Sequence, residues 1–437
     1  MKKSLFAVLA VLMITAMVLA ACPAATPASA PEPAAPAADA PAASADPAVC
    51  TACDDPAGCV TLAANDPLTI AWMFVVSGPD GSLGTDTKRG AEIAQDDRPT
   101  VAGHTVELIG EDEGCNAEGG QAAGTKVASN SKVVAAIGTN CSSAARAAIP
   151  LLYNAGIPMV SPSNTAPDLT AEDRPAEYGF YMRTAHNDLV QGAAMADYAY
   201  GAGYRNAATI HDGSLYADQL QQVFAARFLE IGGAIVAQEA TDPTETNMGP
   251  MLTRIAAANP DFIYLPIFIA AGGQIASQAK QNADLADVQL AGADGIFSPD
   301  FLAAAGAASE GFLWSSPDFS AFGAGYADFL AKHREKYGEN TLAPFHAHAF
   351  DAYNLAADAI EKVAVKCSNG STVIPRTALR DAMLTTSGLS GLTGTLSCTA
   401  TGDCADPNIA VYQGMSADVA SWNPGASEDS NPKKIWP

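Results

Sequence analysis

Two segments of the chain place clusters of hydroxyl groups directly after a short apolar run. One cluster contains Ser142 and Ser143, and the other contains Ser163 and Thr165. A serine at the start of a helix can cap its free N–H groups, and the same groups can bind an anion. The two clusters together therefore predict a site for a carboxylate, whereas a plain helix cap or turn is the alternative for either cluster alone.

A carboxylate in the later half of the chain would complement such a site. Asp294 follows the apolar run 288–291, and ligands of open parallel sheets bind beyond the carboxyl ends of the strands. A carboxylate that projects into a cleft at this point would bind an ammonium group. The alternative is a turn aspartate before Gly295.

Strands and helices that alternate along the chain must position these residues. Nearly continuous apolar strands separated by amphipathic stretches are typical of parallel sheets covered on both faces, an α/β doubly wound fold. The alternation is too long for one sheet, so we expect two α/β lobes with a cleft between them. The predicted strands are 68–76, 105–109, 133–137, 157–160, 207–211, 262–269 and 288–291, and the predicted helices are 117–130, 143–155, 188–200, 215–231, 248–258, 271–282, 321–337 and 346–363.

The composition narrows the range of functions. The 437 residues include 47 acidic and 23 basic side chains, a formal net charge of −24. This balance argues against nucleic acid as a partner, because phosphate contacts draw on Lys and Arg. Hydrophobic residues make up 49% of the chain and charged residues 16%, which is enough apolar surface for a sizeable core.

The N-terminus has the features of an export signal. Two lysines precede an apolar run, 5–21, which ends in small residues directly before Cys22. This ending resembles the bacterial lipobox, which implies removal of a signal peptide, 1–21, and a lipid on the thiol of Cys22. An ordinary signal peptide with an incidental cysteine and an uncleaved anchor helix are the alternatives. The Ala- and Pro-rich linker, 22–65, would then tether the protein to a membrane outside the cytoplasm, in the periplasm or at the cell surface.

Six motifs along the chain carry a resemblance to a known family. They lie at 111–116, 141–143, 161–170, 179–184, 210–212 and 260–264. These motifs resemble those of the leucine/isoleucine/valine-binding proteins, the type I periplasmic binding proteins that feed branched-chain amino acid ABC importers. The resemblance extends from Leu68 to about Ile360, and the spacing from Cys141 to Ser161 matches without a gap.

The resemblance implies a particular chain path. It predicts two doubly wound parallel-sheet lobes joined by three crossovers. Lobe one would comprise 66–186 and 318–391, and lobe two would comprise 187–317 and 392–437.

The resemblance also assigns roles in binding an amino acid. Ser142 and Thr165, with backbone groups around Ser163, would bind the α-carboxylate and part of the ammonium group. Tyr216 would reach in from the second lobe, and Asp294 stands where the family's ammonium-binding carboxylate lies.

Three positions depart from the family pattern. Asp294 is a methylene shorter than the usual Glu, so its contact with an ammonium group requires a water molecule or a shifted ligand. Phe268 stands where an aromatic residue, often Tyr, meets the ligand, and Leu83 stands where relatives often place an aromatic residue. The half of the site that binds the zwitterion is therefore retained better than the half that binds the side chain. The sequence predicts an amino acid as the ligand without naming which one.

The cysteines predict disulfides. Without Cys22, eight of the nine cysteines remain, an even number that suits an exported chain. The resemblance implies a disulfide between Cys115 and Cys141. The segment 398–404 is predicted as a hairpin closed by its own disulfide. The remaining expected pair is Cys53 with Cys59, and the pairing of the two cysteines left over, Cys50 and Cys367, stays open.

No cofactor or metal ion is expected. The segment 119–126 is a near miss of a P-loop, but its Lys comes one residue late. His346 and His348 lie two apart in a predicted helix, where they do not share a face. The three cysteines within 50–59 lack a fourth zinc ligand at a suitable spacing. No nucleophile elbow and no H-E-x-x-H motif occurs, so we do not expect an enzyme.

We therefore expect a lipid-anchored solute-binding protein of an ABC importer. It would capture an amino acid, branched-chain or another small zwitterion, between two closing lobes and deliver it to the permease. Its only contact with the membrane would be the lipid anchor. A sensor or receptor domain that uses the same clamp for signalling is the alternative, and an exported hydrolase is disfavoured because no nucleophile–base pair was found.

Overall fold

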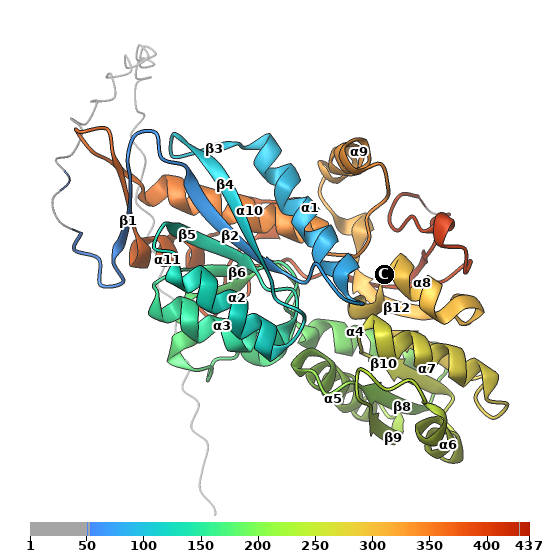
Figure 1. Cartoon of the computed structure of the whole chain (residues 1–437). Helices are drawn as coiled ribbons and strands as arrows, with labels where there is room; N and C mark the ends of the chain where they lie inside the picture. The colour runs from blue at the N-terminus through green and yellow to red at the C-terminus, as the bar shows by residue number, and fades with distance from the viewer. Residues whose placement is uncertain (1–49, 51–52, 428) are drawn as a thin grey trace, which may run out of the picture. The chain divides into compact units, whose positions relative to one another are not determined.

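The computed structural model describes residues 50, 53–427 and 429–437, and Figure 1 shows their helices and strands. The predicted signal peptide, Cys22 and the Ala- and Pro-rich part of the linker lie outside these residues. Within the described part of the chain, no helix combines the length and the apolar character that a membrane crossing requires.

The first sheet has six strands, and its central strands β2 and β5 are buried on both faces. Alternate residues of its central strands pack against α2 and α3 on one face and against α1 and α10 on the other. This explains why β5 is apolar and buried along its whole length. The order is β3 (Thr100–Val101), β4 (His104–Asp112), β2 (Leu68–Phe74), β5 (Val133–Gly138), β6 (Met159–Ser161) and β7 (Tyr181–Arg183), covered by α1 (Gly81–Asp97), α2 (Ala117–Ser129), α3 (Ser142–Asn154) and α10 (His346–Val363).

The second sheet has seven strands, and the five from β9 to β12 are parallel. Two antiparallel strands from the C-terminal part of the chain extend it beyond β12. The order is β18 (Lys433–Trp436), β17 (Ile409–Gln413), β12 (Leu313–Pro317), β11 (Gln289–Gly292), β10 (Phe262–Leu265), β8 (Asn206–His211) and β9 (Ala234–Ala240), with α4 (Asp188–Gly201), α5 (Leu215–Glu230), α6 (Gly249–Ala257), α7 (Ile269–Gln281) and α8 (Pro299–Ala305) between the strands. The predicted α/β class with parallel sheets is confirmed.

The chain passes between the two sheets three times. It leaves the first sheet after β7 and builds the second from β8 to β12. It then returns through α9 (Tyr326–Tyr337) to α10, which packs on the first sheet, and finally enters the second sheet again at β17. This path follows the predicted crossovers, while the exact lobe boundaries remain a prediction.

Two predicted elements differ from the structure for local reasons. The strand expected at 262–269 ends at Leu265, because Pro266 has no N–H group to continue the ladder, and α7 already begins at Ile269. The helix expected at 321–337 begins only at Tyr326, after Gly323 and Gly325.

Helix α1 was not predicted, because its sequence carries few large apolar residues. Its glycines instead allow the backbone of a neighbouring helix to approach closely. A Cβ atom on Gly90 would lie 1.9 Å from the carbonyl oxygen of His346 in α10. The two helices therefore pack backbone to backbone, and hydrophobic periodicity did not reveal this contact.

Small antiparallel sheets and four disulfides complete the described residues. The strands β1 (Cys59–Leu62), β14 (Thr372–Pro375) and β13 (Val365–Lys366) form one small sheet, and β15 (Leu389–Ser390) pairs with β16 (Thr395–Leu396); α11 (Arg376–Leu384) follows β14. The disulfides join Cys53 with Cys59, Cys115 with Cys141, and Cys398 with Cys404, as expected, and Cys50 with Cys367, a pairing that the sequence left open. The segment 398–404 forms a closed turn rather than a hairpin of two assigned strands.

Candidate functional site

The carboxyl ends of the parallel strands bring the predicted residues to one cavity. In the first sheet the strand order reverses between β2 and β5, and in the second between β8 and β10. Such switch points are where open α/β sheets bind ligands. The cavity is lined by Leu83, Asn140, Ser142, Ser163, Thr165, Tyr216, Phe268, Asp294, Gly295 and Phe345.

The first sheet contributes hydroxyl groups and a helix N-terminus. Ser142 is the first residue of α3, and its Oγ accepts the N–H of Ala166 at 3.3 Å. Ser163 Oγ donates to the carbonyl oxygen of Asn140 at 3.1 Å. These bonds join the two hydroxyl clusters, because β5 and β6 are neighbours in the sheet. The first-turn N–H groups of α3 have no acceptor within the helix, so this end of the cavity suits an anion.

The second sheet contributes a buried acid. Asp294 is 3% exposed, and its Oδ1 accepts the phenolic hydrogen of Tyr216 at 2.5 Å. Burial, followed by the charge of Asp294, raises the pKa of Tyr216 well above its usual value, so the phenol stays a donor at neutral pH. The Oδ2 of Asp294 lies 3.3 Å from Nε2 of His186. This acid is therefore held in place by the chain rather than placed in an exposed turn.

A layer of buried polar residues lies behind this acid, and the sequence analysis assigned no role to it. His186 Nε2 lies 2.7 Å from Oε1 of Gln191. Burial opposes protonation of His186, but the hydrogen bond and charge of Asp294 outweigh it and raise the pKa of the imidazole. Burial and the charge of Asp294 raise the pKa of Asp188 to about 8. The signal that could have revealed this layer is the run of three polar residues, 186–188, that closely follows a buried strand.

A second buried acid supports the helix N-terminus of the first sheet. Glu113 is fully buried, and its carboxylate accepts the N–H groups of Cys115 at 3.1 Å and Cys141 at 3.2 Å. Burial raises the pKa of Glu113 to about 8, although these hydrogen bonds oppose the shift. This side chain was also not singled out from the sequence, and it connects the two ends of the disulfide next to α3.

The remaining wall of the cavity is apolar. It includes Leu83, which lies in α1, and Phe345, which directly precedes α10. Phe268 packs on Tyr216 with ring centroids 5.2 Å apart. Leu83 and Phe268 line the cavity, and their contact with a ligand side chain stays a prediction; Asn140 and Phe345 also line it and were not predicted.

Hydrogen bonds join the loops of the two sheets around the cavity. Ser143 does not line the cavity; its Oγ accepts the N–H of Leu215, at the start of α5, at 3.0 Å. Asp80 Oδ1 accepts the N–H of Ile269, at the start of α7, at 3.2 Å. Burial raises the pKa of Asp80 to about 6. The loops of the first sheet are therefore in contact with the loops of the second sheet.

The other residues weighed from the sequence lie in structural roles. His346 is buried and bonds to Asp86 and Tyr326, and His348 is buried beside Phe345. The segment 119–126 lies within α2. Among the residues that the structure describes, no group of three or more His, Cys, Asp or Glu side chains is placed to hold a metal ion.

Two α/β sheets with a polar cavity at their facing strand ends define the two-lobed class of solute-binding proteins. The chain belongs to the periplasmic binding protein family, whose model matches residues 67–418. Membership of this family implies an extracytoplasmic location.

Several known proteins are similar to this chain, and those named here are binding proteins rather than enzymes. The Leu/Ile/Val-binding protein of Escherichia coli (strain K12) is 27% identical over 270 residues, which cover 60% of this chain and 72% of that protein. A Leu/Ile/Val-binding protein homolog 3 of Brucella melitensis is 25% identical over 80% of this chain and 92% of that protein.

Solved structures show the same fold. The leucine binding protein LivK of Thermotoga maritima is 26% identical, with a TM-score of 0.72, over 80% of this chain and 96% of that chain. A solute binding protein of an ABC transporter from R. palustris, in complex with 4-hydroxybenzoate, has a TM-score of 0.72 at 19% identity, over 85% of this chain and 96% of that chain. The latter shows the fold alone.

Proposed function

We propose that this protein binds an amino acid, branched-chain or another small one, and delivers it to the permease of an ABC importer. The observation that carries the proposal is the polarity of the cavity. A helix N-terminus with Ser142 and Thr165 lies on one side, and the buried carboxylate of Asp294 lies on the other. A buried zwitterion needs both of its charges matched, since an unpaired charge costs several kcal/mol. The names of the similar binding proteins support the same ligand class.

The proposed mechanism is binding without a chemical step. The carboxylate of the amino acid docks at the N-terminus of α3, and the loops of the second sheet close over its ammonium group. In this proposal, the hydrogen bonds of Leu215 with Ser143 and of Ile269 with Asp80 belong to the closed form. Closure is stabilised only by the difference in ligand affinity between the closed and the open form.

A thermal-shift screen of the twenty amino acids against residues 50–437 tests the ligand class. At least one α-amino acid should raise the melting temperature, because binding to the folded state alone is stabilising. The matched controls lack one charge each: the corresponding deaminated acid and the decarboxylated amine. Equal stabilisation by either control, or no stabilisation by any amino acid, would contradict the proposal.

The proposed attachment to the membrane depends on Cys22. The full chain should partition with membranes, and Cys22→Ser should be found in the soluble fraction, because the acyl chains would be absent. A Cys22→Ser protein that stays with the membranes would point to an uncleaved anchor helix instead.

A further inference from the structure

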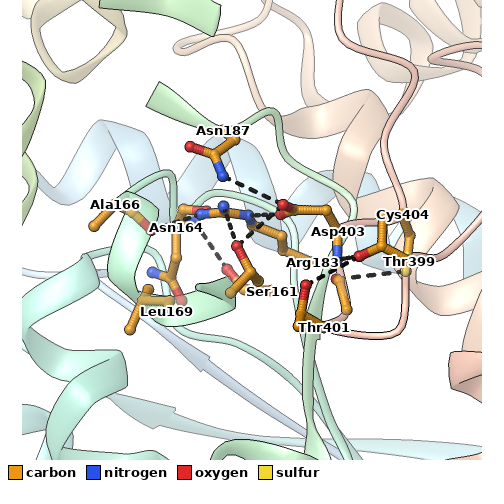
Figure 2. A network of polar contacts seen from close by, with 12 residues as sticks. Ser161, Asn164, Ala166, Leu169, Arg183, Asn187, Thr399, Thr401, Asp403 and Cys404 are labelled. Carbon is orange, nitrogen blue, oxygen red and sulfur yellow. Dashed lines mark hydrogen bonds and ion pairs between the residues drawn. The ribbon is translucent and has the colours of Figure 1, made fainter. Parts of the chain in front are cut away.

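A buried cation lies at the end of β7, outside the lining of the cavity. The side chain of Arg183 is 0% exposed, and its Nε donates to Oδ1 of Asp403 at 2.5 Å (Figure 2). A charge this deeply buried needs a charged partner. The partner comes from the turn 398–404, far away in the sequence, and is itself only 29% exposed.

The other arm of the same guanidinium reaches the backbone of the proposed binding segment. Its Nη1 donates to the carbonyl oxygens of Asn164, at 3.2 Å, and Ala166, at 2.9 Å. These two residues flank Thr165, whose own carbonyl oxygen accepts the N–H of Asp188 at 2.9 Å. Because the guanidinium is a rigid planar fork, it fixes both flanking carbonyl groups at once.

The turn that supplies Asp403 is tied to β7 along its backbone. The N–H of Arg183 donates to the carbonyl oxygen of Gly402 at 2.8 Å, and the N–H of Cys404 donates to the carbonyl oxygen of Arg183 at 3.0 Å. A disulfide between Cys398 and Cys404 closes the turn. These contacts hold the carboxylate of Asp403 in register with the guanidinium.

Two further side chains complete the network around the carboxylate. Thr170 Oγ1 accepts from Nη2 of Arg183 at 2.6 Å and donates to Oδ2 of Asp403 at 3.1 Å. Asn187 Nδ2 donates to the same Oδ2 at 3.2 Å. The carboxylate is therefore oriented from several sides, and Figure 2 shows its contacts with Arg183 and Asn187.

We propose that Arg183 and Asp403 are positioning residues that set the location of the Thr165 hydroxyl in the cavity, so that the disulfide-closed turn 398–404 controls ligand affinity without touching the ligand. Neither residue lines the cavity. The proposal rests on the proposed function, in which Thr165 contacts the amino acid.

A double-mutant cycle tests this coupling. The dissociation constant is measured by calorimetry for the wild type, Asp403→Asn, Thr165→Ala and the double variant. The probe is L-leucine, or the amino acid that raises the melting temperature most in the screen above. Asp403→Asn should raise the dissociation constant about tenfold in the wild type and less than about twofold in the Thr165→Ala background, because coupled residues are not additive.

A matched control is available in another ion pair. Nη1 of Arg98 lies 2.5 Å from Oδ1 of Asp358, and the side chain of Asp358 is 35% exposed. Asp358→Asn removes a comparable charge away from the cavity, so it should leave the dissociation constant unchanged while it lowers the melting temperature. The same fold-change for Asp403→Asn in both Thr165 backgrounds, or none in either, would overturn the positioning role.

A milder variant keeps the test decisive if Asp403→Asn does not fold. Thr170→Val removes one hydroxyl from the network and leaves both charges in place. It should also raise the dissociation constant, by about threefold, and lose this effect when combined with Thr165→Ala. If Thr165→Ala itself binds like the wild type, the proposed function fails at this residue. If Thr165→Ala weakens binding but shows no coupling, only the positioning role fails.

Discussion

The two sides of the cavity offer a ligand different kinds of partner. The loops of the first sheet contribute hydroxyl groups and the free N–H groups of α3, all neutral. The loops of the second sheet contribute one carboxylate, Asp294, held by the phenol of Tyr216. In the proposed function, binding on the first side is thus spread over several weak donors, whereas binding on the second side depends on the charge of Asp294. A single substitution should therefore weaken binding far more on the second side than on the first.

Removal of the charge on Asp294 should have the largest effect. Asp294→Asn leaves a buried ammonium group without its counter-charge, so we expect a loss of about 3–5 kcal/mol in binding free energy. Calorimetry with an α-amino acid and with its deaminated analogue measures the difference. The amino acid should lose more than the analogue; equal losses would remove the ammonium role.

Removal of one hydroxyl from the first side should have a smaller effect. In the proposed function, Thr165→Ala deletes one charge-assisted hydrogen bond to the ligand, so we expect a loss of about 1–3 kcal/mol in binding free energy. Thr253→Ala, in α6, is the matched control, because Thr253 is exposed and bonds only to the carbonyl oxygen of Gly249. Unchanged affinity in Thr165→Ala would show that the first side binds without this hydroxyl.

The buried acid beneath α3 should make stability depend on pH. The pKa of Glu113 is raised by burial to about 8 in the folded state, from an ordinary value of 4.5. Between these values the unfolded chain loses its proton while the folded chain keeps it, so the free energy of unfolding falls as the pH rises. Glu113→Gln should reduce this pH-dependent decrease in the free energy of unfolding by a few kcal/mol at most.

Denaturant unfolding at several pH values measures this slope. Glu118→Gln changes an exposed acid in α2 and serves as the control. An unchanged slope in Glu113→Gln would show that the acid is ionised in the folded state, and the first side of the cavity would then carry a negative charge.

Removal of the Ser143 hydroxyl should have the smallest effect. Its Oγ accepts the N–H of Leu215 and lies outside the cavity lining. We expect Ser143→Ala to weaken amino-acid binding by about 0.5–1.5 kcal/mol, through loss of a bond formed on closure. A loss as large as that of Thr165→Ala would indicate that Ser143 contacts the ligand directly.

The sequence predicted the parts of the site that follow buried strands. The apolar runs of the sequence predicted where β5, β6 and β11 end. Because Ser142, Thr165 and Asp294 follow these strands, their positions at the carboxyl edges of the sheets could also be predicted. Their roles came from the resemblance to a family rather than from the pattern itself.

The parts that the sequence did not reveal depend on distant partners. The small sheet pairs Cys59 of β1 with Pro375 of β14, and no local pattern indicates such a contact. The role of Asp403 follows from its ion pair with Arg183, which lies 220 residues away in the sequence. Phe345, directly before α10, lines the cavity although it lies about 200 residues after the hydroxyl clusters, and Asn140 is held there by a hydrogen bond from its Nδ2 to Oγ1 of Thr87 in α1.

A crystal structure of residues 50–437 with the amino acid that stabilises them most tests the central claim most directly. The account predicts the carboxylate of the amino acid at the N-terminus of α3, within hydrogen-bond distance of Ser142 or Thr165, and the ammonium group facing Asp294. A ligand bound outside this cavity, or bound with its two charged groups exchanged, would contradict it.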